Sequence, residues 1–578
     1  MKNRKQNVKN SFFIKIKNSI NLFSNCFVLL SLLAIVSINC FCKKQSFSIM
    51  SSGYQSITPD DPYFGNSWHL SRIEADKAWE ITTGFNSVSV AVVDSGIDNI
   101  NPYTISDLSV NLDATNSLDL SQDLNGTPFC DYLHFSPTGT HGTRVAYILG
   151  ANGDDGVNGS GVCWESNIVS IRCSGLSSGI SLSDISEIFD ENETNYRGDI
   201  SIMNMSVGLA ESSSQPSIPG VSDLITGINN YDGLIVVCAG NQSRDLDNTS
   251  YNVYPASISS NNMIVVGASD DDDEKLNYSN YGENKVDLFA PGENLLSPVY
   301  FSNDGTNVIY GGMQGFDGTS GATPLVTGTA VLIKSVNPSL TSSQIKQLIL
   351  DNVDQVDGLN NLCVSGGRLN AYRAVKAAIP EITVFNSFIN AIQPLPSNKH
   401  QFYKISLTPG NYTFETSGSL YTSGCLYGVD IETGPIASST NQSGNFTLSF
   451  PTIKNRDVYL KVTNNSSITG TYSLKVTNSH THSYNHHYLN YNSYSHKAYC
   501  SCGLYQIKPH IANGLNNVCI MCGGIYSDPL SSPESNIVNI GTDSVILSNG
   551  VVVLGINDYN AFLFGALDVD SWVGGMSQ

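Results

Sequence analysis

Short runs of mostly apolar residues, separated by stretches of helical character, are the feature that most restricts how this chain can fold. These runs cover residues 88–93, 168–171, 200–205, 234–238 and 263–267. They are too short for helices, and they carry too few polar residues for strands with one face in water. Strands that are buried on both faces occur in parallel sheets covered by helices. The sequence therefore predicts an α/β domain built on a parallel sheet.

Polar side chains come just after three of these runs. Asp94 follows the first run, Ser206 follows the third, and Asn241 comes shortly after the fourth. Ligands of open parallel sheets bind beyond the carboxyl ends of the strands. We therefore expect these three residues at one edge of the sheet, next to the functional site.

Three short segments that contain glycine carry the groups of a serine-hydrolase triad. They are Val-Asp-Ser-Gly around Asp94, Thr-His-Gly-Thr around His141 and Gly-Thr-Ser-Gly around Ser320. Each residue alone has an ordinary structural role, such as a turn-capping aspartate or an N-cap serine. Together they supply a carboxylate to orient a ring, an imidazole as general base and a hydroxyl as nucleophile. We expect Ser320 at the N-cap of the helical run that follows it, with Pro324 in the first turn.

The three segments, in the chain order Asp94, His141, Ser320, resemble those of the subtilisin-like serine proteases, or subtilases. The resemblance extends over about residues 54–380. It implies the subtilase fold, a serine endopeptidase activity and a catalytic role for these three residues. It also includes Val-Val-Cys-Ala-Gly-Asn-Gln, which implies that the side-chain amide of Asn241 donates to the oxyanion of the reaction intermediate.

The same resemblance implies how a substrate binds. Asn-Met-Ser-Val-Gly at 204–208 resembles the edge strand that pairs with the substrate backbone and walls the primary pocket, which requires an extended peptide. The residues that the resemblance assigns to substrate binding are Ser206, Val207, Gly208, Ala239 and Gly240. The chain departs from the family at Gly321, where many relatives have methionine, at Arg144, where histidine is common, and at Tyr147, where glycine is common.

One loop resembles the calcium loop of the family. It reads Asn-Gly-Asp-Asp-Gly-Val-Asn-Gly and begins at Asn152. The resemblance implies a structural calcium ion with Asn152, Asp154 and Asn158 as ligands. Asparagine, aspartate and glycine also form ordinary turns, so the sequence leaves that alternative open.

A second metal site is expected in a Cys/His-rich segment at 478–526. This segment carries a Cys-x-Cys pair, a Cys-x-x-Cys pair and six of the ten histidines. The candidate zinc ligands are Cys500, Cys502, Cys519 and Cys522. Short-spaced cysteine pairs suit tetrahedral zinc, and two disulfides are the alternative in an extracellular protein.

The chain of 578 residues is long enough for several domains. Alternating apolar and polar residues after the α/β domain predict an all-β sandwich, which resembles the pre-peptidase C-terminal domains of secreted proteases. Such a module is either a spacer or a surface-binding domain. We predict a signal peptide at 1–42, an N-terminal linker at 43–67, the subtilisin-like catalytic domain at 68–380, the β-sandwich at 381–477, the Cys/His-rich module at 478–526 and a C-terminal tail of β character at 527–578.

Charge and the N-terminus bear on location and partners. Basic residues precede an apolar run at 26–42, as in a secretory signal, although an uncleaved anchor has the same pattern. The net charge of −21 repels phosphates, so we expect no nucleic-acid partner. We expect a secreted or cell-surface protein that acts on polypeptides. Two alternatives are a surface-binding protein with an inert protease scaffold and a processing protease with one exported partner.

Overall fold

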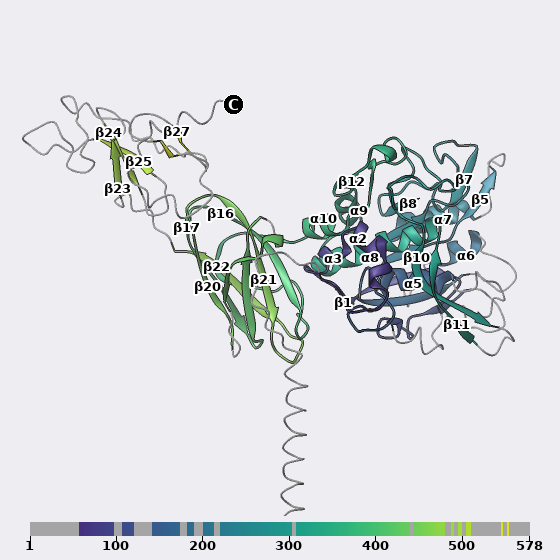
Figure 1. Cartoon of the computed structure of the whole chain (residues 1–578), viewed down its shortest axis with the longest axis horizontal. Helices are drawn as coiled ribbons and strands as arrows, with labels where there is room; N and C mark the ends of the chain where they lie inside the picture. The colour runs from purple at the N-terminus through teal and green to yellow at the C-terminus, as the bar shows by residue number, and fades with distance from the viewer. Residues whose placement is uncertain are drawn as a thin grey trace, which may run out of the picture. The chain divides into compact units, whose positions relative to one another are not determined.

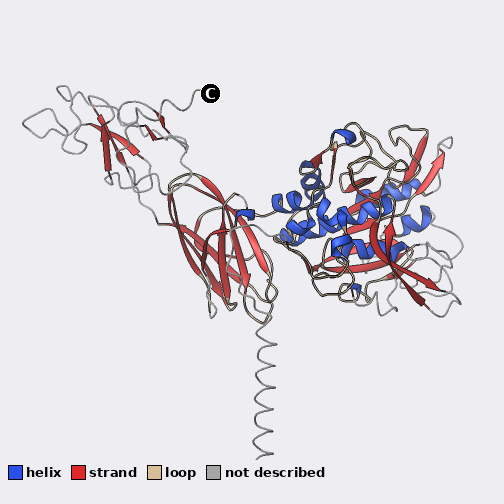
Figure 2. Ribbon diagram, viewed as in Figure 1, coloured by secondary structure: helices blue, strands red, loops and turns tan. Residues whose placement is uncertain are grey.

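The computed structural model describes two folded domains (Figures 1 and 2). The described residues are 57–97, 107–120, 141–173, 182–189, 200–212, 220–302, 308–429, 431–439, 444–479, 487–490, 495–499, 505–509, 545–546 and 552–553. The predicted signal peptide at 1–42 and the four candidate zinc cysteines lie outside them. Within the described ranges, no helix has the length and apolar character needed to cross a membrane.

The α/β domain is built on a nine-stranded sheet with the order β12-β13-β9-β8-β6-β4-β1-β3-β2. Its strands are β1 (Gly84–Asp94), β2 (Leu118–Asp119), β3 (Glu165–Arg172), β4 (Ile200–Met205), β6 (Leu234–Cys238), β8 (Met263–Ser269), β9 (Leu288–Pro291), β12 (Asp354–Gln355) and β13 (Gly367–Arg368). Neighbouring strands are parallel except for β12 and β13. The five apolar runs of the sequence are β1, β3, β4, β6 and β8, so the predicted parallel sheet is confirmed.

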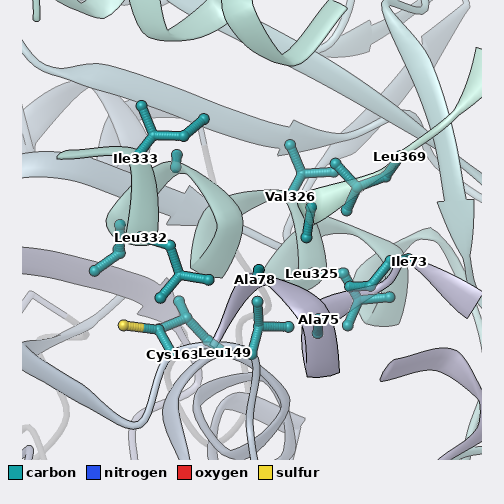
Figure 3. Close-up of a cluster of buried hydrophobic side chains, with 14 of the residues drawn as sticks. Ile73, Ala75, Ala78, Leu149, Cys163, Leu325, Val326, Leu332, Ile333 and Leu369 are labelled. Atoms are coloured by element: carbon teal, nitrogen blue, oxygen red, sulfur yellow. The ribbon is translucent and has the colours of Figure 1, made fainter. Parts of the chain in front are cut away.

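Successive residues of β1 face two separate apolar clusters. Val90 and Val92 belong to one cluster, and Ala91 and Val93 belong to the other. Helices therefore cover both faces of the sheet, which explains why the central residues of the strands are mostly apolar. Figure 3 shows the first cluster, in which the central helix α8 (Thr319–Val336) packs against side chains from several other elements.

The other helices of this domain pack against one or the other of the two clusters. They are η1 (Phe64–Asn66), α2 (Trp68–Arg72), α3 (Ala75–Ala78), α5 (His141–Gly150), α6 (Leu182–Glu187), α7 (Val221–Asn230), α9 (Ser342–Asp351), η4 (Asp357–Leu359) and α10 (Ala371–Ala377). Two strand pairs stand apart from the main sheet. They are β5 (Leu209–Ser212) with β7 (Tyr251–Tyr254), and β10 (Leu295–Ser302) with β11 (Val308–Phe316).

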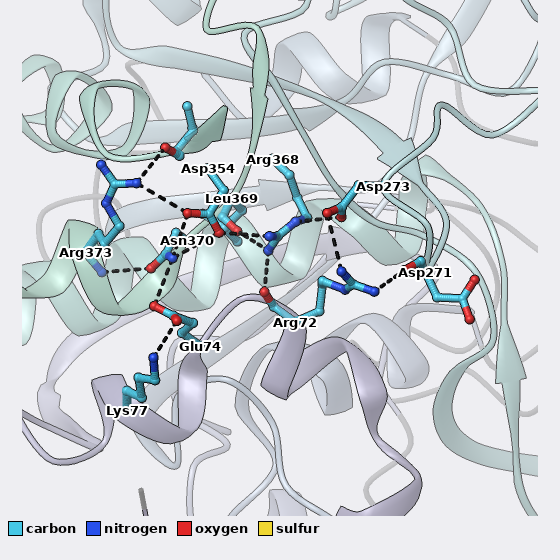
Figure 4. Close-up of polar contacts among 11 residues, drawn as sticks. Arg72, Glu74, Lys77, Asp271, Asp273, Asp354, Arg368, Leu369, Asn370 and Arg373 are labelled. Atoms are coloured by element: carbon cyan, nitrogen blue, oxygen red, sulfur yellow. Dashed lines mark hydrogen bonds and ion pairs between the residues drawn. The ribbon is translucent and has the colours of Figure 1, made fainter. Parts of the chain in front are cut away.

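Polar contacts fasten the start of the α/β domain to its end (Figure 4). Arg368 of β13 forms ion pairs with Asp273 at 2.7 Å and Asp354 at 2.8 Å, and it donates to the backbone carbonyl of Arg72. Burying the Arg368 guanidinium costs little because two carboxylates compensate its charge. The α2–α3 lead-in is therefore an integral part of this domain.

The second domain consists of two sheets that share one apolar core. Their orders are β14-β16-β21-β18-β19 and β15-β22-β17-β20. The elements are β14 (Glu381–Ile382), β15 (Phe385–Asn390), β16 (His400–Leu407), β17 (Gly410–Gly418), β18 (Thr422–Tyr427), η5 (Ile431–Thr433), β19 (Pro435–Ser439), β20 (Thr447–Thr452), β21 (Arg456–Asn464) and β22 (Tyr472–Asn478). Alternate residues of β17, such as Tyr412 and Phe414, point into the core, as the sequence pattern predicts.

Short strands follow in the C-terminal part of the chain. They are β23 (His487–Asn490), β24 (Ser495–Tyr499), β25 (Tyr505–Pro509), β26 (Val545–Ile546) and β27 (Val552–Val553). The first three form one antiparallel sheet, and the last two form a separate pair.

Candidate active site

Asp94 and His141 form a hydrogen-bonded pair at the carboxyl end of β1, with the carboxylate buried and the ring partly exposed. Asp94 is the last residue of that strand, and His141 is the first residue of α5. The distance between His141 Nδ1 and Asp94 Oδ1 is 2.7 Å, and Oδ1 also accepts from the backbone N–H of Ser95 at 2.8 Å. Because a carboxylate only accepts, Nδ1 carries the proton and Nε2 is left to act as a base.

Gly142 permits this close approach of α5 to β1. A Cβ at this position would lie 2.2 Å from the carbonyl oxygen of Gly96 and 3.1 Å from Asp94 Cβ. Any larger residue would push His141 away from Asp94. The contact between His141 and Asp94 therefore requires glycine at position 142.

Ser320 lies in the first turn of α8, where the expected capping arrangement is wrong. The N-cap is Gly318, which has a φ of 120°, so Ser320 is the second residue of the helix and Pro324 the sixth. Pro324 has no N–H to donate to the carbonyl of Ser320, four residues earlier. That carbonyl instead accepts from Ser206 Oγ at 2.9 Å, and Ser320 Oγ donates to the carbonyl of Ser206 at 3.1 Å. The proline thus frees a carbonyl that ties the nucleophile to the end of β4.

Asn241 lies beside the same helix terminus. Its Oδ1 accepts from the backbone N–H of Thr319 at 3.0 Å and from Thr319 Oγ1 at 2.9 Å. These two donors fix the orientation of the amide, so the Nδ2 group is the one that remains to bind a ligand. A Cβ at Gly318 would lie 3.2 Å from Asn241 Nδ2, which places this donor two residues from the nucleophile.

The two predicted substrate-binding segments flank Ser320. The first starts at Ser206, which exchanges hydrogen bonds with Ser320. The second includes Ala239 and Gly240, and the N–H of Gly240 donates to Thr319 Oγ1 at 3.2 Å. A methyl group of Val253 lies near both segments, because added Cβ atoms at Gly208 and Gly240 would lie 3.3 Å and 3.4 Å from its Cγ1.

Phe316 connects His141 with the residue after the nucleophile. Its ring centroid lies 5.3 Å from that of His141, with an angle of 77° between the rings. A Cβ at Gly321 would lie 3.3 Å from Phe316 Cδ1 and 2.8 Å from Leu295 Cδ1. These two side chains fill the space that a side chain at position 321 would need, which explains the glycine. Sequence reasoning missed Phe316 and Val253 because neither has a local signal.

The loop that resembles a calcium site is held by hydrogen bonds within the loop and to neighbouring segments. Asn152 Nδ2 donates to Asp155 Oδ2, Asp154 Oδ1 accepts from the N–H of Asp60, and Asn158 Nδ2 donates to Asp107 Oδ1. These three side chains have separate partners.

The backbone of the same loop faces an anion. The N–H groups of residues 154–156 donate to the carboxylate of Asp61, and N–H groups cannot ligate a cation. Among the described residues, no group of three or more acidic, histidine or cysteine side chains could hold a metal ion. The arrangement does not fit a calcium ion held by Asn152, Asp154 and Asn158.

Comparisons with known proteins agree with this geometry. Residues 86–366 match the model of the subtilase family, Peptidase_S8. An extracellular basic protease of Dichelobacter nodosus is 28% identical over an alignment of 360 residues, and the match covers 56% of this chain and 57% of that protein. Halolysin of Haloferax mediterranei is 30% identical over 318 residues, covering 55% of this chain and 54% of halolysin.

A shorter relative is covered almost completely. Thermitase of Thermoactinomyces vulgaris is 28% identical over 322 residues, which are 55% of this chain and 99% of thermitase. The chain spans just over half the length of the first two relatives, and in all three cases little more than half of this chain is matched. The predicted family resemblance is confirmed, and the α/β domain of this chain belongs to the subtilase family.

Proposed function

We propose that this chain is a serine endopeptidase that hydrolyses extended polypeptides through an acyl-enzyme on Ser320. The observation that carries the proposal is the 2.7 Å contact between Asp94 and His141 in a domain that also presents Ser320 and a correctly oriented Asn241 amide. A buried carboxylate that orients an imidazole has little structural use unless the ring accepts and returns a proton. All groups needed for acyl transfer are thus provided by the residues of this domain.

The reaction follows from these positions. Ser320 Oγ turns from the Ser206 carbonyl toward His141, which takes its proton as the oxygen attacks the scissile carbonyl carbon. Asn241 Nδ2 donates to the oxyanion that forms. His141 then protonates the leaving amine, and a water molecule attacks the acyl-enzyme in the same way. Asp94 stabilises the imidazolium in both halves of the reaction without accepting its proton.

Action outside the cytoplasm is part of the proposal. Several matched relatives are named extracellular proteases, and the N-terminal sequence has the pattern of a secretory signal. The zinc site of the Cys/His-rich segment remains a prediction, because its four cysteines lie outside the described residues.

Labelling with a fluorophosphonate tests the activity. The reagent should modify the wild-type chain at Ser320, as mapped by mass spectrometry, and should not modify the Ser320→Ala variant. A folded wild-type protein that takes up no label and cleaves no denatured protein would show that the domain is an inert scaffold. Digestion of a peptide library then separates a broad endopeptidase from a processing enzyme with one partner.

We also infer that the side chain before the cleaved bond is small. That side chain enters between the segment that starts at Ser206 and the segment at Ala239–Gly240. Val253 is 3% exposed and places its methyl group within van der Waals reach of both segments. Strand pairing with Ala210 and hydrogen bonds to Ser257 fix its backbone. In this proposal Val253 forms the floor of the pocket, and the pocket accepts alanine or serine.

Shortening Val253 should enlarge this pocket. The wild type is expected to cleave peptides with alanine before the scissile bond about 10-fold or more faster than peptides with phenylalanine, measured as kcat/KM. Val253→Gly should raise kcat/KM for the phenylalanine peptide about 10- to 100-fold, because a few methyl groups in an apolar pocket have effects of this size. Val286→Ala, a fully buried valine elsewhere in the domain, is the control for general loosening. Equal cleavage of both peptides by the wild type would contradict the inference.

A further inference from the structure

Arg144 lies one helical turn after His141 and reaches across to the β10–β11 hairpin. Its Nε donates to Ser297 Oγ at 2.8 Å, and its Nη2 donates to the carbonyl of Gln314 at 2.9 Å. Ser297 and Gln314 are direct partners in the hairpin, so one guanidinium binds both strands at the same level. Only the planar, forked head of arginine can make both contacts.

The same guanidinium covers the ring of Phe316. Arg144 Cζ lies 4.6 Å from the centroid of that ring. Burial lowers the pKa of Arg144 to about 10, which still leaves the side chain protonated at neutral pH. A cation over an aromatic face is attracted by about 0.5–2 kcal/mol, depending on exposure. Phe316 is 8% exposed, so this contact and the hairpin together hold the ring in one place.

The ring of Phe316 in turn contacts His141. The two centroids are 5.3 Å apart at an angle of 77°, which is a favourable edge-to-face arrangement. Asp94 fixes the position of Nδ1, and a tilt of the ring about that hydrogen bond would change the direction in which Nε2 points. A second contact on the flank of the ring restricts this tilt and therefore the direction in which Nε2 points.

We propose that Arg144 and Phe316 are positioning residues for the general base, Phe316 by contacting the His141 ring and Arg144 by holding Phe316 in place. Arg144 and His141 both lie on α5, three residues apart, so one rigid element carries the base and the group that clamps the hairpin against it. The inference rests on the proposed endopeptidase function and assigns a role to a position where this chain departs from its relatives.

Steady-state kinetics of purified variants of the full chain test the proposal. Arg144→Ala and Phe316→Leu should each lower kcat about 10-fold, because misplacing a reacting group by about 1 Å costs up to about 100-fold. KM should stay within about twofold, because neither residue is expected to bind the substrate. Phe316→Tyr keeps the ring and should retain most of the activity. Arg144→Lys keeps the charge but cannot bridge both strands, so its kcat should lie between those of wild type and Arg144→Ala.

The double variant gives the sharpest result. If Arg144 acts through Phe316, the combination Arg144→Ala with Phe316→Leu should lose no more activity than Phe316→Leu alone, whereas independent effects would multiply. Arg373→Ala is the matched control, since this arginine also donates to a backbone carbonyl, with a carboxylate in place of the hydroxyl, but lies on α10. Its kcat should equal that of the wild type.

Several outcomes would overturn the proposal. They are an unchanged kcat in Arg144→Ala, a raised KM with normal kcat, and multiplicative losses in the double variant. Fluorophosphonate titration normalises every rate to the concentration of active sites, so a partly unfolded variant does not imitate a slow one. If Phe316→Leu does not fold, the comparison of Arg144→Ala with Arg144→Lys decides the result. A wild type without any endopeptidase activity would instead refute the proposed function.

Discussion

Replacing Asp94 with asparagine is expected to lower kcat about 10,000-fold while the protein stays folded. The carboxylate is 2% exposed in its side chain, lies 2.7 Å from His141 Nδ1 and also accepts from the N–H of Ser95. An amide of the same shape can present its NH₂ group to Nδ1. The ring then carries its proton on Nε2, the atom that must accept the proton of Ser320. The variant also lacks the negative charge of Asp94 that stabilises the imidazolium.

The experiment compares kcat of Asp94→Asn with that of the wild type on a peptide amide, together with the melting temperature of each. Asp113→Asn is the control. Asp113 accepts hydrogen bonds from the Asn167 side chain and from the backbone N–H groups of Thr115 and Asn116, and none of these partners is a histidine. Together these bonds outweigh desolvation and lower the pKa of Asp113. A loss of less than about 10-fold in Asp94→Asn would mean that His141 does not act as the general base.

The parallel sheet could be predicted because burial on both faces leaves a local mark on the sequence. β6 is apolar along its whole length, and β1, β3, β4 and β8 each contain a mostly apolar run, as expected for strands covered on both faces. Asp94 could also be placed at the sheet edge, because it ends such a run. For these elements, the composition of a few consecutive residues already contains the information.

Residues whose roles arise from contacts between distant segments could not be predicted. Val253 lies beside the predicted substrate-binding segments only because β7 pairs with β5, and Phe316 touches His141 only because the β10–β11 hairpin packs on α5. The prediction of Ser320 as the N-cap of α8 is wrong for a related reason. Proline usually occupies the first turn of a helix, but Ser206 provides the hydrogen bond that Pro324 removes, so α8 can start earlier.

The sequence assigns no role to Thr319, although this residue lies in the Gly-Thr-Ser-Gly motif around Ser320. Its backbone N–H and its hydroxyl both donate to Asn241 Oδ1. The resemblance to the subtilases implies that Asn241 is the oxyanion donor, and the contacts with Thr319 explain the orientation of its amide. The sequence therefore indicates which groups take part, and the structure explains their orientation.

Substituting Asn241 with leucine should lower kcat about 100- to 1,000-fold and leave KM nearly unchanged. This range comes from a member of the same family. The substrate carbonyl is a weak acceptor in the ground state, and the charge that the amide binds develops only in the transition state. An interaction of this kind appears in kcat and contributes little to substrate binding.

The Asn241→Asp variant distinguishes the loss of the N–H donor from a change in the shape of the side chain. Aspartate keeps an oxygen that can accept from Thr319, but its second oxygen faces the developing oxyanion with a negative charge. Its kcat should therefore be at least as low as that of Asn241→Leu. Asn229→Leu, on the exposed end of α7, is the control for the loss of an amide and should keep full activity. If Asn241→Asp retained most of its turnover, the oxyanion would have to be stabilised by backbone N–H groups at the start of α8, and the role given to Asn241 would be wrong.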